Sequence, residues 1–79
     1  MNSQEYIEVA IKIAPFSEEN AEIVTAEISE LPFESFTMDD PYLKCYIQKE
    51  LYDAQMLKVV LSGAEGMGFD IDFTADLMP

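Results

Sequence analysis

Residues 31–47, LPFESFTMDDPYLKCYI, contain two runs rich in aromatic and β-branched residues that meet at an Asp-Asp-Pro corner. The first run predicts a strand over Phe33 to Met38, and the second predicts a strand over Tyr42 to Ile47. Asp39-Asp40-Pro41 has the residues of a turn. Because side chains alternate along a strand, one face of the second strand carries Leu43, Cys45 and Ile47, and the other carries Tyr42, Lys44 and Tyr46. The middle of the chain therefore predicts a β-hairpin.

A strand and a helix are predicted before this hairpin. Residues 6–13, YIEVAIKI, alternate strictly between apolar and other residues, which is typical of a strand with one covered face. Ser17 is a good N-cap for a helix that should run to about Glu30, because Pro32 prevents its continuation. The apolar stripe of this helix has a spacing of three and four and consists of Ala21, Val24, Ile28 and Leu31.

A second helix and a fourth strand are predicted after the hairpin. Asp53 should cap a helix from Ala54 to about Ser62, and Gly63 suits the left-handed position at its C-terminal end. The apolar stripe of this helix consists of Ala54, Leu57, Val60 and Leu61. The strand over residues 69–76, FDIDFTAD, should alternate between the inward residues Phe69, Ile71, Phe73 and Ala75 and the outward residues Asp70, Asp72, Thr74 and Asp76.

The resulting order of elements is β-α-β-β-α-β. Two right-handed split β-α-β units interleave in this order, which predicts an antiparallel sheet with strand order 4-1-3-2 and both helices on one face. The fold class is therefore α+β, a ferredoxin-like plait. Its 79 residues suffice for one domain with a thin core, and we expect a single domain over residues 1–79.

The charge balance restricts the choice of partners. Sixteen acidic residues face four lysines, and arginine and histidine are absent, which gives a net charge of −12. This charge repels nucleic acid and anionic membranes, and no apolar run approaches the ~20 residues that a membrane span requires. A basic protein partner would complement the charge, although solubility alone also explains it. A single cysteine and the lack of a secretory signal favour the cytoplasm.

The sequence offers few reactive side chains. Without histidine, the commonest general base is missing, and Cys45 on an inward strand face has no partner to activate it. Zinc requires histidine or several cysteines, and the paired aspartates do not follow a calcium-loop pattern. The run GAEGMG precedes a strand, so we expect a connector and not a phosphate loop. We therefore predict no catalytic, metal-binding or cofactor-binding residues in this chain.

The open face of the predicted sheet is the first candidate for a binding surface. Tyrosines interleaved with charges suit a protein contact, and they equally suit ordinary cross-strand pairing. The residues that we assign to a partner on this face are Glu8, Tyr42, Lys44, Tyr46, Asp70 and Asp72. RNA-recognition modules have a similar topology, but their sequence motif is missing here and the field has the wrong sign.

The acidic side of the first helix is the second candidate. Its members outside the apolar stripe include Glu19, Glu22, Ile23 and Glu30. Glu30 lies near the helix C-terminus, where the macrodipole disfavours a negative charge by a few tenths of a kcal/mol. A solvated helix face accounts for these residues, and a contact face for a basic partner is the alternative.

Three segments in order, YIEVAIKI, SEENAEIVTAEISELPFESF and LKCYI, resemble the N-terminal domain of the ribosomal protein L-eleven methyltransferases. The YIEV strand, the acidic helix and the FESF segment running into DDPYLKCYI match in order and spacing, over essentially the whole chain. In that family, a small plait precedes a tryptophan-rich linker and a Rossmann-like S-adenosylmethionine domain. The plait binds the ribosomal protein, and the second domain methylates amino groups of that protein.

The resemblance implies a substrate-recognition domain of a protein methyltransferase, with a basic ribosomal protein of the large subunit as its partner. Because the chain stops at Pro79, we expect an isolated and catalytically silent N-terminal domain. S-adenosylmethionine is then expected in a domain that this chain lacks. Two alternatives stay open: a regulatory plait that binds a small molecule, similar to ACT domains, and a purely structural interaction module.

Overall fold

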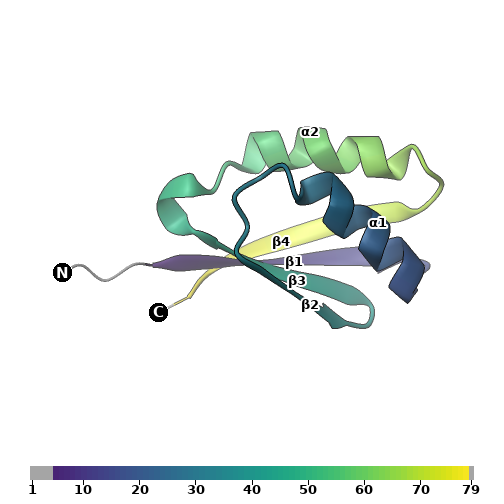
Figure 1. Cartoon of the computed structure of the whole chain (residues 1–79), viewed down its shortest axis with the longest axis horizontal. Helices are drawn as coiled ribbons and strands as arrows, with labels where there is room; N and C mark the ends of the chain where they lie inside the picture. Colours follow the sequence, from purple (N-terminus) through teal and green to yellow (C-terminus); the bar gives the residue numbers. More distant parts are fainter. Residues whose placement is uncertain (1–4, 79) are drawn as a thin grey trace.

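The order of the elements agrees with the prediction. The computed structural model describes residues 5–78, and Figure 1 shows both helices on the same side of one sheet. The elements are β1 (Tyr6–Ala14), α1 (Glu18–Ile28), β2 (Ser35–Asp39), β3 (Tyr42–Gln48), the 3-10 turn η1 (Lys49–Leu51), α2 (Ala54–Glu65) and β4 (Asp70–Met78). All strand pairs are antiparallel, and the order β2-β3-β1-β4 is the predicted order read from the opposite edge. The ferredoxin-like plait is therefore confirmed.

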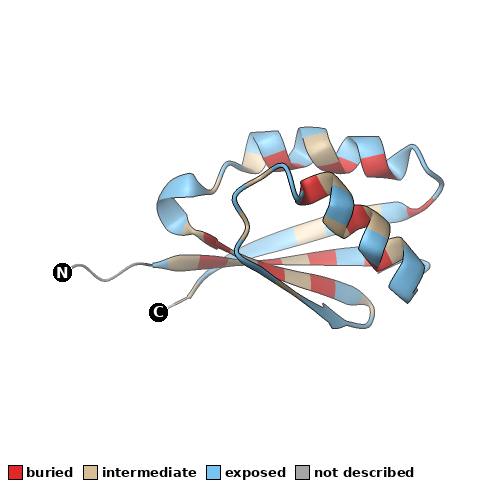
Figure 2. Cartoon of the chain, in the orientation of Figure 1, coloured by how far each residue is buried: buried red, intermediate tan, exposed pale blue. Residues whose placement is uncertain are grey.

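The core lies between the sheet and the two helices, and it is drawn mainly from the two central strands. Figure 2 shows buried and less buried residues alternating along β1 and β3. The predicted inward residues of these strands are all buried, namely Ile7, Val9, Ile11, Ile13, Leu43, Cys45 and Ile47. The helices complete the core with Ala21, Val24, Ile28, Leu57, Leu61 and Ala64. Burial of one face leaves the opposite face of the sheet open.

The first helix begins as predicted and ends slightly earlier. The Ser17 side chain accepts a hydrogen bond of 3.0 Å from the amide of Asn20, so it is the N-cap. The last helical residue is Ile28, not Glu30, because the amide of Leu31 donates to the Ile28 carbonyl and tightens the chain into a turn. Leu31 therefore packs against the core from outside the helix.

The second strand is displaced from its predicted position. It begins at Ser35 instead of Phe33, because the amide of Phe33 is used in a turn, where it donates to the Leu31 carbonyl. The Phe33 ring instead packs near Phe36, with 6.1 Å between ring centroids. The strand ends at Asp39, one residue later than predicted.

The second helix is longer than predicted. It continues to Glu65, and Gly63 lies inside it, so the left-handed end that we expected at Gly63 is wrong. Ala64 is fully buried on the same stripe as Leu57 and Leu61, and this burial continues the helix past the glycine. In the part of the chain that the structure describes, the residue with a positive φ is Gly68, at 107°, in the turn that leads to β4.

The fourth strand is only partly covered by the helices. Ile71 and Phe73 pack against the core as predicted, but Ala75 is exposed, although the register places it on the helix side, opposite Val9. Leu77, two residues further along the same side, is 51% exposed. The inward prediction for Ala75 fails because the helix layer leaves this half of the edge strand open.

Candidate functional site

The six residues assigned to the open face lie there together. Tyr42, Lys44 and Tyr46 come from β3, Glu8 from β1, and Asp70 and Asp72 from β4. The strand register places Glu8 directly opposite Tyr46, and it places Lys12 opposite both Tyr42 and Asp72. The alternation in the sequence therefore located one continuous surface over three neighbouring strands.

A cross-strand pair occupies the centre of this face. The Tyr46 hydroxyl donates a hydrogen bond of 2.7 Å to Oε2 of Glu8. This hydrogen bond, assisted by partial burial and by the negative charge of Glu8, raises the pKa of the Tyr46 hydroxyl above its ordinary value. The two side chains satisfy each other, as expected for a directly opposed pair.

A second hydrogen-bonded group, centred on Glu34, was missed in the sequence. Its Oε1 accepts a bond of 2.8 Å from the Tyr6 hydroxyl, and its Oε2 accepts one of 2.9 Å from Nε2 of Gln48. The bond from Gln48, followed by the bond from Tyr6, lowers the pKa of Glu34. The hydrogen bond between Tyr6 and Glu34 also raises the pKa of the Tyr6 hydroxyl. Glu34 falls inside the predicted strand Phe33 to Met38 but precedes β2 in the structure. Its bonds to Tyr6 and Gln48 depend on the pairing of β1 with β3, which the sequence alone does not give.

An ion pair occupies the hairpin end of the open face. Nζ of Lys44 lies 3.1 Å from Oδ2 of Asp39, and this contact raises the pKa of the Lys44 ammonium group. Asp70 and Asp72 are exposed on the edge strand β4. Oδ1 of Asp72 accepts a hydrogen bond from the neighbouring amide of Phe73. The centre and the hairpin end of the open face are therefore polar and paired within the domain.

The residues assigned to the first helix divide into two groups. Glu19 and Glu22 are exposed on α1, and Glu30 is exposed in the turn that follows it. Ile23 differs, because it is partly buried and packs against the core, which explains its position among acidic neighbours. Helix α1 covers the face of the sheet opposite to the six open-face residues, so the two sets are separate surfaces.

An apolar groove between α1 and β2 was not predicted. It has a volume of about 310 Å³ and is lined by Glu22, Thr25, Ala26, Ser29, Phe36, Met38 and Leu43. Met38 is 43% exposed there, while Leu43 is buried beneath. Small side chains on α1 leave the groove open, but only the packing of the helix beside the edge strand reveals it.

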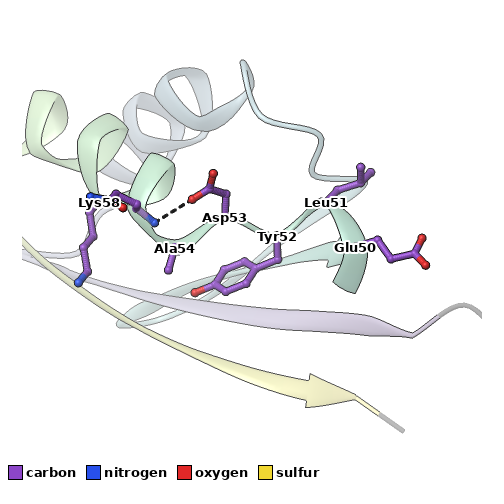
Figure 3. A pocket seen from close by; sticks show the side chains of 7 residues that line it. Glu50, Leu51, Tyr52, Asp53, Ala54 and Lys58 are labelled. Atoms are coloured by element: carbon purple, nitrogen blue, oxygen red, sulfur yellow. Dashed lines mark hydrogen bonds between the residues drawn. The ribbon is translucent and has the colours of Figure 1, made fainter.

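A wider hollow lies where η1 passes into α2. It measures about 900 Å³, and its lining residues are Glu50, Leu51, Tyr52, Asp53, Ala54, Gln55 and Lys58. Figure 3 shows the Tyr52 ring directed toward the sheet and Glu50 directed away from it. Desolvation, followed by the charge of Asp53, raises the pKa of the Tyr52 hydroxyl. Oδ1 of Asp53 is engaged by the amides of Gln55 and Met56, both at 3.1 Å, so this carboxylate caps α2.

The only thiol in the sequence is enclosed in the core. Cys45 is fully buried, and its desolvation raises the pKa of the thiol from 9.0 to about 12. A thiol with this pKa is almost entirely protonated at neutral pH, and protonated thiols are poor nucleophiles. Within residues 5–78, no three side chains of the metal-binding types come together as a possible ion site.

Comparisons with known proteins do not assign this chain to a family. No protein-family model matches it, and no curated protein matches it. Over the part of the chain that the structure describes, neither helix is both long and apolar enough to cross a membrane.

Proposed function

We propose that this plait binds a basic protein, as the substrate-recognition domain of an enzyme similar to the ribosomal protein L-eleven methyltransferases. The resemblance of the strand, helix and hairpin segments supports this proposal, and so does the ferredoxin-like fold that it implies. The net charge of −12 suits a cationic partner such as a ribosomal protein of the large subunit. The cytoplasm, where ribosomes are made, is the matching location.

The negative charge of the open face is the main observation that supports the proposal. By strand register, the acids on this face are Glu8, Asp39, Asp70, Asp72 and Asp76, and its lysines are Lys12 and Lys44. One of the two lysines, Lys44, is already paired with Asp39. The remaining carboxylates, above all those of β4, produce a negative potential that accelerates encounter with a positively charged protein.

The role proposed for this plait is recognition and not methyl transfer. A methyl-donor site of the Rossmann type places a glycine-rich loop between a strand and the following helix. In this chain, Gly63 lies inside α2, and the residues after it form the helix end and the turn into β4. These residues do not fit an S-adenosylmethionine cradle, so the proposed role is recognition, and catalysis is assigned to another domain.

Titration with the N-terminal domain of ribosomal protein L-eleven tests the proposal. Isothermal titration calorimetry at low and moderate salt should show binding that weakens steeply as the salt concentration rises. The double variant Asp70→Asn/Asp72→Asn should weaken binding by about two- to fivefold per charge and flatten the salt dependence. Thr74→Asn on the same strand is the matched neutral control.

The same titration separates the alternatives. Absence of binding, or binding that is insensitive to salt and to the aspartate variant, would contradict the proposal. Saturable binding of a free amino acid with dimerisation would instead favour an ACT-like regulatory plait.

A further inference from the structure

The groove between α1 and β2 has the form of a site for one apolar side chain. Its wall on the helix side consists of Glu22, Thr25 and Ala26 of α1 and the C-cap residue Ser29, which lie on one side because they are three or four residues apart. Its opposite wall is formed by Phe36 and Met38 of β2, with Leu43 at the base. Apart from Glu22, the lining is apolar or neutral, and about 310 Å³ is ample for a leucine or phenylalanine side chain.

The strand beside the groove is an edge strand with little protection. β2 and β4 are the two edges of the sheet. Natural edge strands avoid pairing with other chains through charges, prolines or bulges. β4 carries Asp70, Asp72 and Asp76, whereas β2 reads SFTMD, and its single charge, on Asp39, is paired with Lys44. Backbone groups on the outer side of β2 are therefore available to an added strand.

The charges around the groove select the occupant. Glu22 lines it, Glu18 lies one helical turn earlier on the same face, and Asp40 follows the end of β2. Among residues 5–78, none of those that line the groove is basic. A second copy of this chain would bring another net charge of −12 to the same edge, and this repulsion opposes self-pairing. An extended segment with lysine or arginine around an apolar residue has the complementary character.

We propose that the outer edge of β2 binds such a basic, extended protein segment as a fifth strand and that the α1–β2 groove holds one of its apolar side chains. Main-chain hydrogen bonds to β2 supply affinity, the groove selects the apolar residue, and the flanking carboxylates select positive charge. This inference rests on the proposed function in one respect, because it names the contact surface for the basic partner. The acidic open face then contributes attraction at long range, and the groove contributes the anchor.

Two probes test the surface. The first is a short synthetic peptide in which lysine alternates with leucine, and the second is the N-terminal domain of ribosomal protein L-eleven. Amide chemical shifts and hydrogen exchange of the labelled domain locate each contact. We expect shifts in residues 35–39 and in the groove side of α1, together with slower exchange of alternate amides of β2. A peptide with alanine in place of leucine should bind about tenfold more weakly or worse.

Neutral substitutions in the groove provide the second readout. Ala26→Gln narrows the groove from the helix side, and Met38→Gln makes its exposed rim polar; both residues are exposed, so the fold should be kept. Each variant should bind both probes about tenfold more weakly, and its thermal unfolding should be unchanged. Val59→Gln is the matched control, because Val59 is 64% exposed on α2, away from the groove. This variant should bind both probes with the affinity of the parent domain.

The outcomes distinguish this inference from the proposed function. If the ribosomal domain binds but shifts only open-face or α2 residues, the groove inference is overturned while the proposed function stands. If the peptide binds along β2 and the ribosomal domain does not bind, the groove inference stands and the proposed function fails. Dimerisation of the free domain through β2 would also overturn the assignment of a basic segment to this edge.

Discussion

Tyr46 on β3 donates its hydroxyl to Glu8 on β1 at 2.7 Å, and the strand register places the two residues directly opposite each other. The bond joins positions 38 residues apart and lies on the face of the sheet that the helices do not cover. It shows why an acidic, tyrosine-bearing sheet face does not by itself identify a contact surface. A side chain that is already satisfied within the domain gains less from a partner than an unsatisfied one.

The Tyr46 hydroxyl should titrate above its ordinary pKa of 10.0, and Glu8→Gln should lower its pKa toward that value. A pKa that is higher in the folded state means that the interaction stabilises the fold below about pH 10 and that this contribution is lost as the pH rises through the folded pKa. Ultraviolet absorbance of tyrosinate measures the titration, and Tyr46→Phe identifies the Tyr46 component. Identical titrations of the parent and Glu8→Gln would contradict the hydrogen bond.

Glu34 should show the opposite dependence at acid pH. Its pKa lies below the ordinary 4.5 because Gln48 and Tyr6 donate to the charged carboxylate. The interaction therefore stabilises the fold above about pH 4.5, and its contribution is lost as the pH falls through the lowered pKa. Tyr6→Phe should raise the carboxyl pKa of Glu34 and bring acid unfolding to a higher pH. The chemical shift of the Glu34 side-chain carboxyl carbon, followed with pH, measures this pKa. The same pKa in the parent and in Tyr6→Phe would contradict the prediction.

The Cys45 thiol should be unreactive in the folded domain at neutral pH. It is fully buried, and its pKa is raised from 9.0 to about 12. Labelling by a thiol reagent should therefore follow global unfolding and accelerate with urea in parallel with the loss of circular dichroism. The raised pKa also means that stability falls between pH 9.0 and about 12, where the unfolded thiol ionises first, by up to about 1.4 kcal/mol per pH unit.

Comparison with Cys45→Ala isolates this effect from the other groups that titrate at high pH. The alkaline decline of stability should be shallower in the variant than in the parent. Rapid labelling of the folded parent at neutral pH would show that the thiol is accessible, which its position in the core does not allow.

Strand alternation was sufficient to predict the inward and outward faces of β1 and β3, because both are central strands with one face covered along their length. It failed at Ala75, since coverage of an edge strand depends on where the helices lie. The helix end at Gly63 was wrong for a similar reason: burial of Ala64 is a tertiary effect that no local glycine signal contains.

The candidate surfaces show the same limit. Alternation placed Tyr42, Lys44 and Tyr46 on one face, but their pairing requires the register between strands that are distant in the sequence. The α1–β2 groove has no local signature at all, because it exists only where the small residues of a helix pass beside Phe36 and Met38 of an edge strand.

Gly63 inside α2 and Gly68 in the turn after it should respond oppositely to alanine. Gly63 lies within the helix, and an added Cβ would approach Oε1 of Glu27 only to 3.6 Å, an ordinary contact. Gly63→Ala should therefore stabilise the domain by about 0.5–1 kcal/mol, because alanine loses less backbone entropy in a helix. Urea unfolding monitored by circular dichroism measures the change.

Gly68→Ala, in the turn between α2 and β4, is the matched control. Its φ of 107° is unfavourable for any residue with a Cβ, although no other atom lies within 4 Å of the added group. The substitution should destabilise the domain by about 1–2 kcal/mol through backbone strain alone. If alanine at position 63 destabilised the domain as much as alanine at position 68, the helix would have to end at Gly63, and the continuation of the stripe through Ala64 would be wrong.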